Sequence, residues 1–216
     1  MAARTLTRAR YESTSPKLCY SAPMARPREF DETAAVEKAM HAFWKHGYEA
    51  TSTQDLCEAT GLGRSSVYNT FTSKRALFRR SLAHYTSTQL DKRQAVLDGP
   101  GTAAERLAAV LDQTIEDDVE ERRRGCLVVN TLAELGLPDD EVGAALRHDT
   151  DRNLTMFAEC VREGVLDGSL RDGLDPADVA EFLLSTTSGL RVMARRGTSR
   201  DSMHAVADLA LASITR

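Results

Sequence analysis

Apolar residues recur with the spacing of an amphipathic helix once the chain passes residue 30. Val36, Met40 and Phe43 fall at i, i+4 and i+7, with Asp31 before them and Gly47 after them. Apolar side chains at this spacing share one face of a helix, and Asp and Gly are typical of helix starts and ends. The pattern therefore predicts a first helix of about four turns between Asp31 and Gly47.

A second pattern predicts two short helices joined by a glycine turn. Ser52 and Asp55 have the spacing of a capping box, which opens a helix that ends near residue 60. The sequence Gly-Leu-Gly at 61–63 interrupts that helix, and a further helix is expected from Arg64 to about residue 70. Two short helices around such a turn have the size of a helix-turn-helix.

The remaining chain also has helical periodicity, so the predicted class is all-α. Longer helices are expected over residues 73–97, 103–120, 125–136, 139–166, 176–196 and 200–215. Only 6% of the residues are aromatic, and the β-branched runs that strands prefer are scarce. Residues 1–23 lack helical periodicity and are predicted to form a disordered arm.

The two parts of the chain differ in charge. Residues 1–93 carry 15 Lys and Arg against 9 Asp and Glu, whereas residues 94–216 carry 13 against 23. A basic region attracts a polyanion and an acidic region is repelled by it, so the asymmetry favours nucleic acid at the N-terminal end only.

The short helix that begins at Arg64 has the chemistry expected of a DNA-reading helix. Val67 and Phe71 lie four residues apart and are expected to pack inward. The residues expected to point outward are Arg64, Ser65, Ser66, Asn69 and Thr70. Arg pairs bidentately with guanine edges and Asn with adenine edges, so this face suits the major groove.

Residues 47–78 resemble the DNA-binding segment of TetR (tetracycline repressor) transcriptional regulators. The positions in register with that family's pattern are Gly47, Tyr48, Thr51, Ser52, Leu56, Gly61, Leu62, Val67, Tyr68, Phe71, Ser73, Lys74 and Leu77. The chain departs from the pattern at Gly63, where the family often has Ser, and at Asn69, where His or Tyr is common.

The resemblance implies a three-helix DNA-binding domain over residues 24–75 and contacts to operator DNA. It implies phosphate contacts from Ser52, Thr53, Tyr68 and Lys74. Base reading is implied for the residues between Arg64 and Asn69, including Ser65 and Ser66.

The resemblance also implies that residues 76–216 form a helical ligand-binding and dimerisation domain. Two helices near the C-terminus are candidates for an intersubunit four-helix bundle. Their apolar residues are Val179, Phe182, Leu183, Leu190, Val192 and Met193 in the first helix and Val206, Leu209, Ala210 and Ile214 in the second. Packing within one chain explains the same pattern equally well. A homodimer would read a palindrome with two recognition helices.

A ligand site needs a few polar groups on otherwise apolar helices. The candidates by this criterion are Asn130, Glu134, Phe157, Cys160 and Thr186. Together with the resemblance, they lead us to expect a repressor that an unidentified small-molecule effector releases from its operator.

The sequence lacks the motifs that are typical of other classes of function. The chain has no P-loop, G-x-S-x-G or H-E-x-x-H, so we expect no enzyme, catalytic residue, cofactor or metal site. No apolar stretch approaches the roughly 20 residues that cross a bilayer. The cysteines are scattered, which favours a reducing cytoplasm. One alternative stays open: a redox-sensing regulator that uses Cys57 or Cys126, the latter after three arginines.

Overall fold

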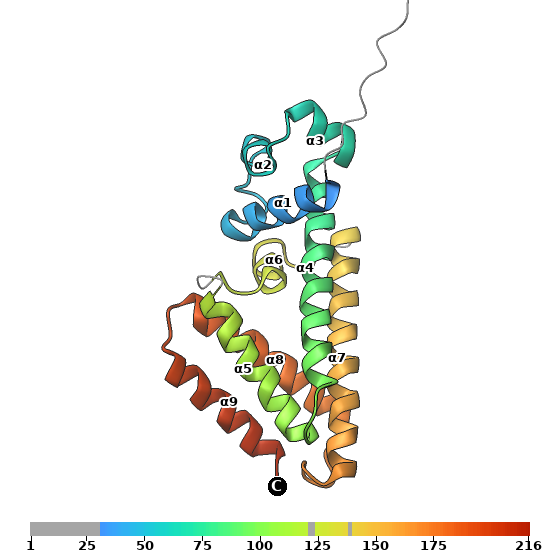
Figure 1. Cartoon of the computed structure of the whole chain (residues 1–216), viewed down its shortest axis with the longest axis vertical. Helices are drawn as coiled ribbons and strands as arrows, with labels where there is room; N and C mark the ends of the chain where they lie inside the picture. The colour runs from blue at the N-terminus through green and yellow to red at the C-terminus, as the bar shows by residue number, and fades with distance from the viewer. Residues whose placement is uncertain (1–30, 121–123, 138–139) are drawn as a thin grey trace, which may run out of the picture. The chain divides into compact units, whose positions relative to one another are not determined.

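The computed structural model describes residues 31–120, 124–137 and 140–216, and within these ranges the chain forms nine α-helices (Figure 1). The same ranges contain only an isolated β-bridge, between Leu170 and Thr215. The predicted all-α class is therefore confirmed. The predicted arm at residues 1–23 lies outside the described residues.

Three helices come first in the described chain, and local hydrogen bonds define their ends. They are α1 (Glu32–His46), α2 (Thr53–Thr60) and α3 (Arg64–Phe71). The Asp31 carboxylate accepts hydrogen bonds from the first N–H groups of α1, and Ser52 and Asp55 form the predicted capping box of α2. Gly61 ends α2 with φ 72°, a left-handed conformation that glycine adopts without a Cβ clash.

A long helix leads from this unit into the C-terminal half. The side chain of Ser73 accepts a hydrogen bond from the N–H of Ala76 and so caps α4 (Lys74–Leu97), which has 24 residues. Phe43 of α1 meets Phe78 of α4 edge to face, with 5.0 Å between ring centroids. Trp44 packs in the same way on Tyr85, at 4.9 Å. These aromatic pairs fix α1 against α4.

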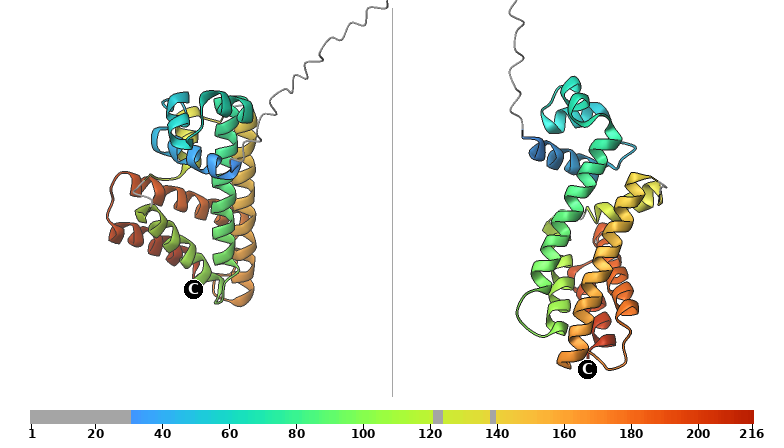
Figure 2. Two further views of the ribbon diagram at one scale, coloured as in Figure 1. Left: turned by 45° about the horizontal axis from the view of Figure 1, so that its top comes forward. Right: turned by 90° about the vertical axis from the view of Figure 1, so that its right-hand side faces the viewer.

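Five helices make up the C-terminal half: α5 (Ala103–Glu120), α6 (Leu127–Leu135), α7 (Glu141–Asp167), α8 (Pro176–Arg195) and α9 (Arg200–Ile214). The long helices α4 and α7 lie side by side, as both views of Figure 2 show. Helix α8 packs against α7, and α5 packs against both α8 and α9, which also contact each other.

Two clusters of buried apolar residues hold these helices together. The larger one surrounds Phe157 of α7 and includes Leu107, Val161 and Leu183 from three helices. The smaller one joins α5, α8 and α9 through residues such as Leu111, Leu190 and Met203. Both clusters are non-polar side chains removed from water, which is the main source of stability in a fold of this kind.

Candidate nucleic-acid interface and regulatory cavity

Helix α3 has one exposed face and one buried face. Arg64, Ser65, Tyr68 and Asn69 are exposed, and they lie at i, i+1, i+4 and i+5. Residues with this spacing form one continuous stripe along a helix. Val67 and Phe71 are each 2% exposed and pack inward as predicted.

Ser66 corrects one expectation about this helix. It was expected to point outward, but it is only 8% exposed. The reason is geometric, since Ser66 precedes buried Val67 and lies four residues before half-buried Thr70, inside the apolar stripe. The outward face therefore consists of Arg64, Ser65, Tyr68 and Asn69, and the expected outward residue Thr70 is half-buried.

The exposed face is braced by contacts with α2. The hydroxyls of Tyr68 and Thr53 are 3.0 Å apart and share a hydrogen bond, and the Arg64 guanidinium lies 5.9 Å from the centroid of the Tyr68 ring. Ser52 is engaged in the cap of α2, where its hydroxyl donates to the Asp55 carboxylate at 2.7 Å. Of these contacts, the Tyr68–Thr53 hydrogen bond joins α3 to the start of α2.

Lys74 lies at the first position of α4, where the helix dipole disfavours a cation. Its Nζ donates to the backbone carbonyl of Glu49 at 3.2 Å and lies 4.5 Å from the centroid of the Tyr48 ring. Both contacts offset that unfavourable position and hold the ammonium beside the helix-turn-helix.

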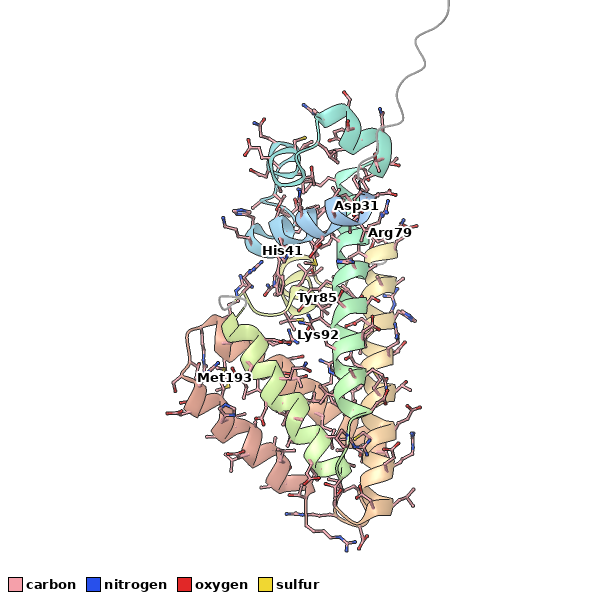
Figure 3. All side chains as sticks on the ribbon, in the orientation of Figure 1. Asp31, His41, Arg79, Tyr85, Lys92 and Met193 are labelled. Atoms are coloured by element: carbon pink, nitrogen blue, oxygen red, sulfur yellow. The ribbon has the colours of Figure 1, made fainter. Side chains whose placement is uncertain are left out.

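Other cations near the start of α4 form ion pairs within the protein. Arg75 pairs with Asp140 and Arg79 with Glu141 at the start of α7, and Arg80 pairs with Glu32 of α1. Arg79 is labelled on α4 in Figure 3. Exposed pairs of this kind contribute roughly 0–1 kcal/mol each, so their main effect is to join α4 to its neighbours.

A separate cavity of about 190 Å³ lies in the C-terminal half, between α4, α6, α7 and α8. Its polar lining includes Tyr85, Arg93, Asp149, Asn153 and Arg191. Tyr85 is labelled in Figure 3, where it extends from α4 toward α6. None of these five residues was a ligand candidate in the sequence. Each is an ordinary polar residue on its own helix, so no local signal singles it out.

The five candidates from the sequence do not line this cavity, and the structure does not bring them together. Asn130 and Glu134 line a second hollow beside α1, whereas Phe157 and Cys160 are buried in the large core cluster. Thr186 is partly buried on α8 and donates to the carbonyl of Phe182. Glu134 has a different partner, since its carboxylate accepts hydrogen bonds from the backbone N–H groups of Tyr48 and Glu49.

The described cysteines differ in accessibility. Cys160 is buried, and burial raises the pKa of its thiol to about 11. Cys57 and Cys126 are partly exposed, and Cys126 precedes α6 and lines the cavity. At neutral pH the Cys160 thiol stays protonated and is a poor nucleophile.

A short helix with an exposed polar face, set on a second short helix by a glycine turn and followed by a helical half with a cavity, defines a helix-turn-helix regulator of transcription. Residues 35–80 match the bacterial regulatory proteins of the tetR family. Residues 103–209 match the tetracyclin repressor-like C-terminal domain.

The chain is also similar to individual transcriptional repressors. It is 32% identical over 207 residues to the HTH-type transcriptional repressor ComR of Escherichia coli (strain K12), covering 92% of this chain and 96% of ComR. It is 28% identical over 158 residues to the repressor DhaR of Mycobacterium sp. (strain GP1), covering 71% of this chain and 77% of DhaR. The chain belongs to the TetR family of transcriptional regulators.

A solved structure agrees with this assignment. A cysteine mutant of the TetR family regulator CifR, in complex with 26-bp double-strand operator DNA, superposes with a TM-score of 0.78 at 37% identity. The match covers 88% of this chain and 99% of the CifR chain.

The described residues also bear on membrane insertion and metal binding. No helix among them is long and apolar enough to span a bilayer. Within the same ranges, no group of three or more His, Cys, Asp and Glu side chains is arranged to hold a metal ion.

Proposed function

We propose that the chain is a dimeric repressor that binds a palindromic operator and is released from it by a small molecule. The observation that carries the DNA-binding part is the exposed stripe of Arg64, Ser65, Tyr68 and Asn69 on a helix whose opposite face is buried. A side that packs on the protein and a polar side that faces outward are what insertion into the major groove requires.

The roles within this stripe follow from side-chain chemistry. Arg64, Ser65 and Asn69 read base edges, since Arg and Asn match guanine and adenine and Ser suits either. The phosphate anchors are Ser52, Thr53, Tyr68 and Lys74. Buried Ser66 supports the helix from its inner side. Phosphate contacts position the protein and base contacts supply specificity.

Dimerisation through α8 and α9 is supported by the large apolar side chains that these helices leave exposed. Phe182 and Val192 of α8 are 40% and 50% exposed, and Val206 and Leu209 of α9 are 38% and 73% exposed. A concentration of exposed apolar residues on two adjacent helices is typical of an interface. A second copy placed against them would form a four-helix bundle with a two-fold axis.

Ligand release is proposed to act through the separation of the two recognition helices. Ligand stabilises an arrangement in which they no longer match the groove spacing, and α4 transmits the change because it spans both halves. To shift a 1:99 equilibrium to 99:1, the ligand must favour that arrangement by roughly 5.5 kcal/mol. The proposal assigns DNA binding to residues 24–75, regulation to residues 76–216 and no catalytic step to the chain.

The alternative regulator is a cysteine-based redox sensor. The feature that favours it is partly exposed Cys126, which lines the cavity together with Arg93 and Arg191. Loss of DNA binding in dilute peroxide, abolished by Cys126→Ser, would support the alternative. Unchanged DNA affinity in peroxide would reject it.

The proposal is tested by selecting bound fragments from genomic DNA and measuring the affinity of the full chain for them by fluorescence anisotropy. We expect palindromic fragments, two chains per duplex and an affinity that falls steeply with salt. Binding that is insensitive to salt, or no binding to any duplex, would contradict the proposal.

A further inference from the structure

The regulatory cavity contains two arginines that are almost fully removed from water. Arg93 of α4 is 9% exposed and Arg191 of α8 is 6% exposed, and both line the cavity. Arginine is rarely buried without a compensating partner, because a guanidinium loses its hydration on burial. Two buried arginines beside one small cavity therefore call for an explanation in terms of what the cavity binds.

The two arginines differ in their hydrogen bonding. The Nε of Arg93 is buried and has no hydrogen-bond partner among the described residues. Arg191 donates to the hydroxyl of Tyr85 at 3.1 Å and to Oε1 of Gln89 at 3.2 Å, among other interactions. Burial, and then the positive charge of Arg191, lower the pKa of Arg93 to about 10. Arg93 therefore remains charged at neutral pH.

The only carboxylate that lines the cavity among the described residues is Asp149 of α7. Burial raises the pKa of Asp149, and the positive charge of Arg93 lowers it to a smaller extent. The titratable groups that line the cavity are therefore two guanidiniums, one carboxyl, the phenol of Tyr85 and the thiol of Cys126. Their formal charge at neutral pH is positive even with Asp149 ionised.

Asn153 contributes a hydrogen-bond acceptor to the cavity, in contrast to the donors of the two arginines. Its Nδ2 donates to the backbone carbonyl of Asp149 at 2.7 Å, which fixes the orientation of the amide. Its Oδ1 is then left as an acceptor, and this atom is buried without a hydrogen-bond partner among the described residues. A buried acceptor of this kind is satisfied by a molecule that brings an O–H or N–H group.

The rest of the cavity is apolar and of limited size. Val128 and Leu132 of α6 and Leu184 of α8 contribute hydrocarbon surface. The volume of about 190 Å³ is somewhat larger than that of an engineered apolar cavity of about 150 Å³ that holds benzene. The space therefore suits one ring, or a chain of similar bulk, together with a small polar group.

From these features we propose that the cavity binds a small organic carboxylate that also carries a hydrogen-bond donor. The carboxylate lies against Arg93 and Arg191, the donor meets Oδ1 of Asn153, and the apolar body packs on α6 and α8. This inference rests on the proposed function in one respect, since it takes the cavity to be the effector site. Arginine is suited to this role because its planar donors match a carboxylate.

The test is a binding series on the full wild-type chain, measured by calorimetry and thermal denaturation. The probes are benzoate and its three hydroxy derivatives, the matching neutral benzamide, the cationic benzylamine, and sodium sulfate at equal ionic strength. We expect benzoate to bind at least tenfold more tightly than benzamide, and at least one hydroxybenzoate to bind more tightly than benzoate. Equal binding of benzoate and benzamide, or equal stabilisation by benzoate and sulfate, would overturn the proposal.

Variants locate the binding within the cavity. Arg93→Gln should reduce benzoate affinity at least tenfold, and Asn153→Leu should remove the affinity difference between hydroxybenzoate and benzoate. Arg106→Gln is the matched control, because Nε of Arg106 is also buried without a partner but its guanidinium pairs with Glu163 outside the cavity. If Arg93→Gln fails to fold, Arg93→Lys keeps the charge without the planar donors and should show a smaller loss. Full benzoate affinity in a folded Arg93 variant would overturn the assignment.

Release from DNA is measured separately, by anisotropy with a selected operator fragment in the presence of each probe. Carboxylate binding that leaves DNA affinity unchanged would contradict the proposed effector role but support the ligand class. Ligand-sensitive DNA binding that responds only to benzamide or benzylamine would support the proposed function and overturn the ligand class.

Discussion

The carboxylate of Glu134 in α6 accepts hydrogen bonds from the backbone N–H groups of Tyr48, at 2.9 Å, and of Glu49, at 2.7 Å. These two residues lie in the loop between α1 and α2, so a helix of the C-terminal half directly holds the helix-turn-helix. The same short helix lines the cavity through Val128 and Leu132. A displacement of α6 by ligand would therefore reach the DNA-binding unit without passing through α4.

Glu134→Gln tests this connection. A neutral amide accepts weaker hydrogen bonds than a carboxylate, so we expect the free energy of unfolding to fall by about 1 kcal/mol. Operator affinity should fall severalfold, because the loop before α2 is no longer held. Chemical denaturation and anisotropy measure the two effects. Glu159→Gln, at an exposed position of α7, is the control and should change neither stability nor operator affinity. Unchanged stability and affinity in Glu134→Gln would exclude a link between α6 and the helix-turn-helix.

Two substitutions separate base reading from phosphate anchoring. Asn69→Ala should relax sequence preference at one base pair, with a loss of about 1–3 kcal/mol of discrimination, while retaining affinity for unrelated duplexes. Lys74→Ala should weaken binding to all duplexes alike and lower the salt slope by about 1. Anisotropy over a set of operator variants at several salt concentrations measures both. An equal loss on every variant for Asn69→Ala would refute its base-reading role.

The proposed dimer interface is tested at its most exposed apolar side chain. Leu209 of α9 is 73% exposed, so Leu209→Glu should leave the fold intact. Burial of this side chain in both copies contributes about 3 kcal/mol, and its loss should weaken dimerisation roughly 100-fold. Analytical ultracentrifugation gives the dissociation constant. Leu166→Glu is the matched control, since Leu166 is 87% exposed near the end of α7 and belongs to neither α8 nor α9. The proposed interface is wrong if both variants dimerise equally.

The uncapped start of α3 offers a gain in stability. Gly63 has φ −68° and ψ 153°, no side-chain cap, and open space where a Cβ would be. Gly63→Ser adds a hydroxyl that caps α3 and removes backbone freedom from the unfolded chain, which should stabilise the fold by about 0.5–1 kcal/mol. Gly61→Ala is the contrasting change, because Gly61 has φ 72° and a side chain there is strained. Denaturation midpoints should move in opposite directions; a loss of stability in Gly63→Ser would contradict the capping argument.

The capping box of α2 makes part of the stability depend on pH. The side-chain and backbone hydrogen bonds from Ser52 lower the pKa of Asp55 below its usual value of 3.8. The folded chain therefore holds the Asp55 proton less tightly than the unfolded chain does. The resulting stabilisation is present above pH 3.8 and is lost as the pH falls through the lowered pKa. The stability difference between wild type and Asp55→Asn should shrink over that acidic range in urea titrations. A difference that is independent of pH would contradict this role.

The sequence by itself determined the helices and the helix-turn-helix. Asp31, Ser52 and Ser73 act on backbone groups two or three residues away, and periodic apolar residues define a helix face locally. The expected starts of α1, α2 and α4 therefore agree with the structure. The family pattern between Gly47 and Leu77 is equally local, because nearly all of it lies within one supersecondary unit.

Only the tertiary structure decided which residues line the cavity and which apolar side chains stay exposed. Tyr85 and Arg191 are hydrogen-bonded although 106 positions separate them along the chain, and helix periodicity carries no information about such a distance. Val192 and Leu190 have the same apolar chemistry on α8, yet one is half exposed and the other buried. The partners that remove Arg93 from water come from other helices, so its burial depends on how those helices pack.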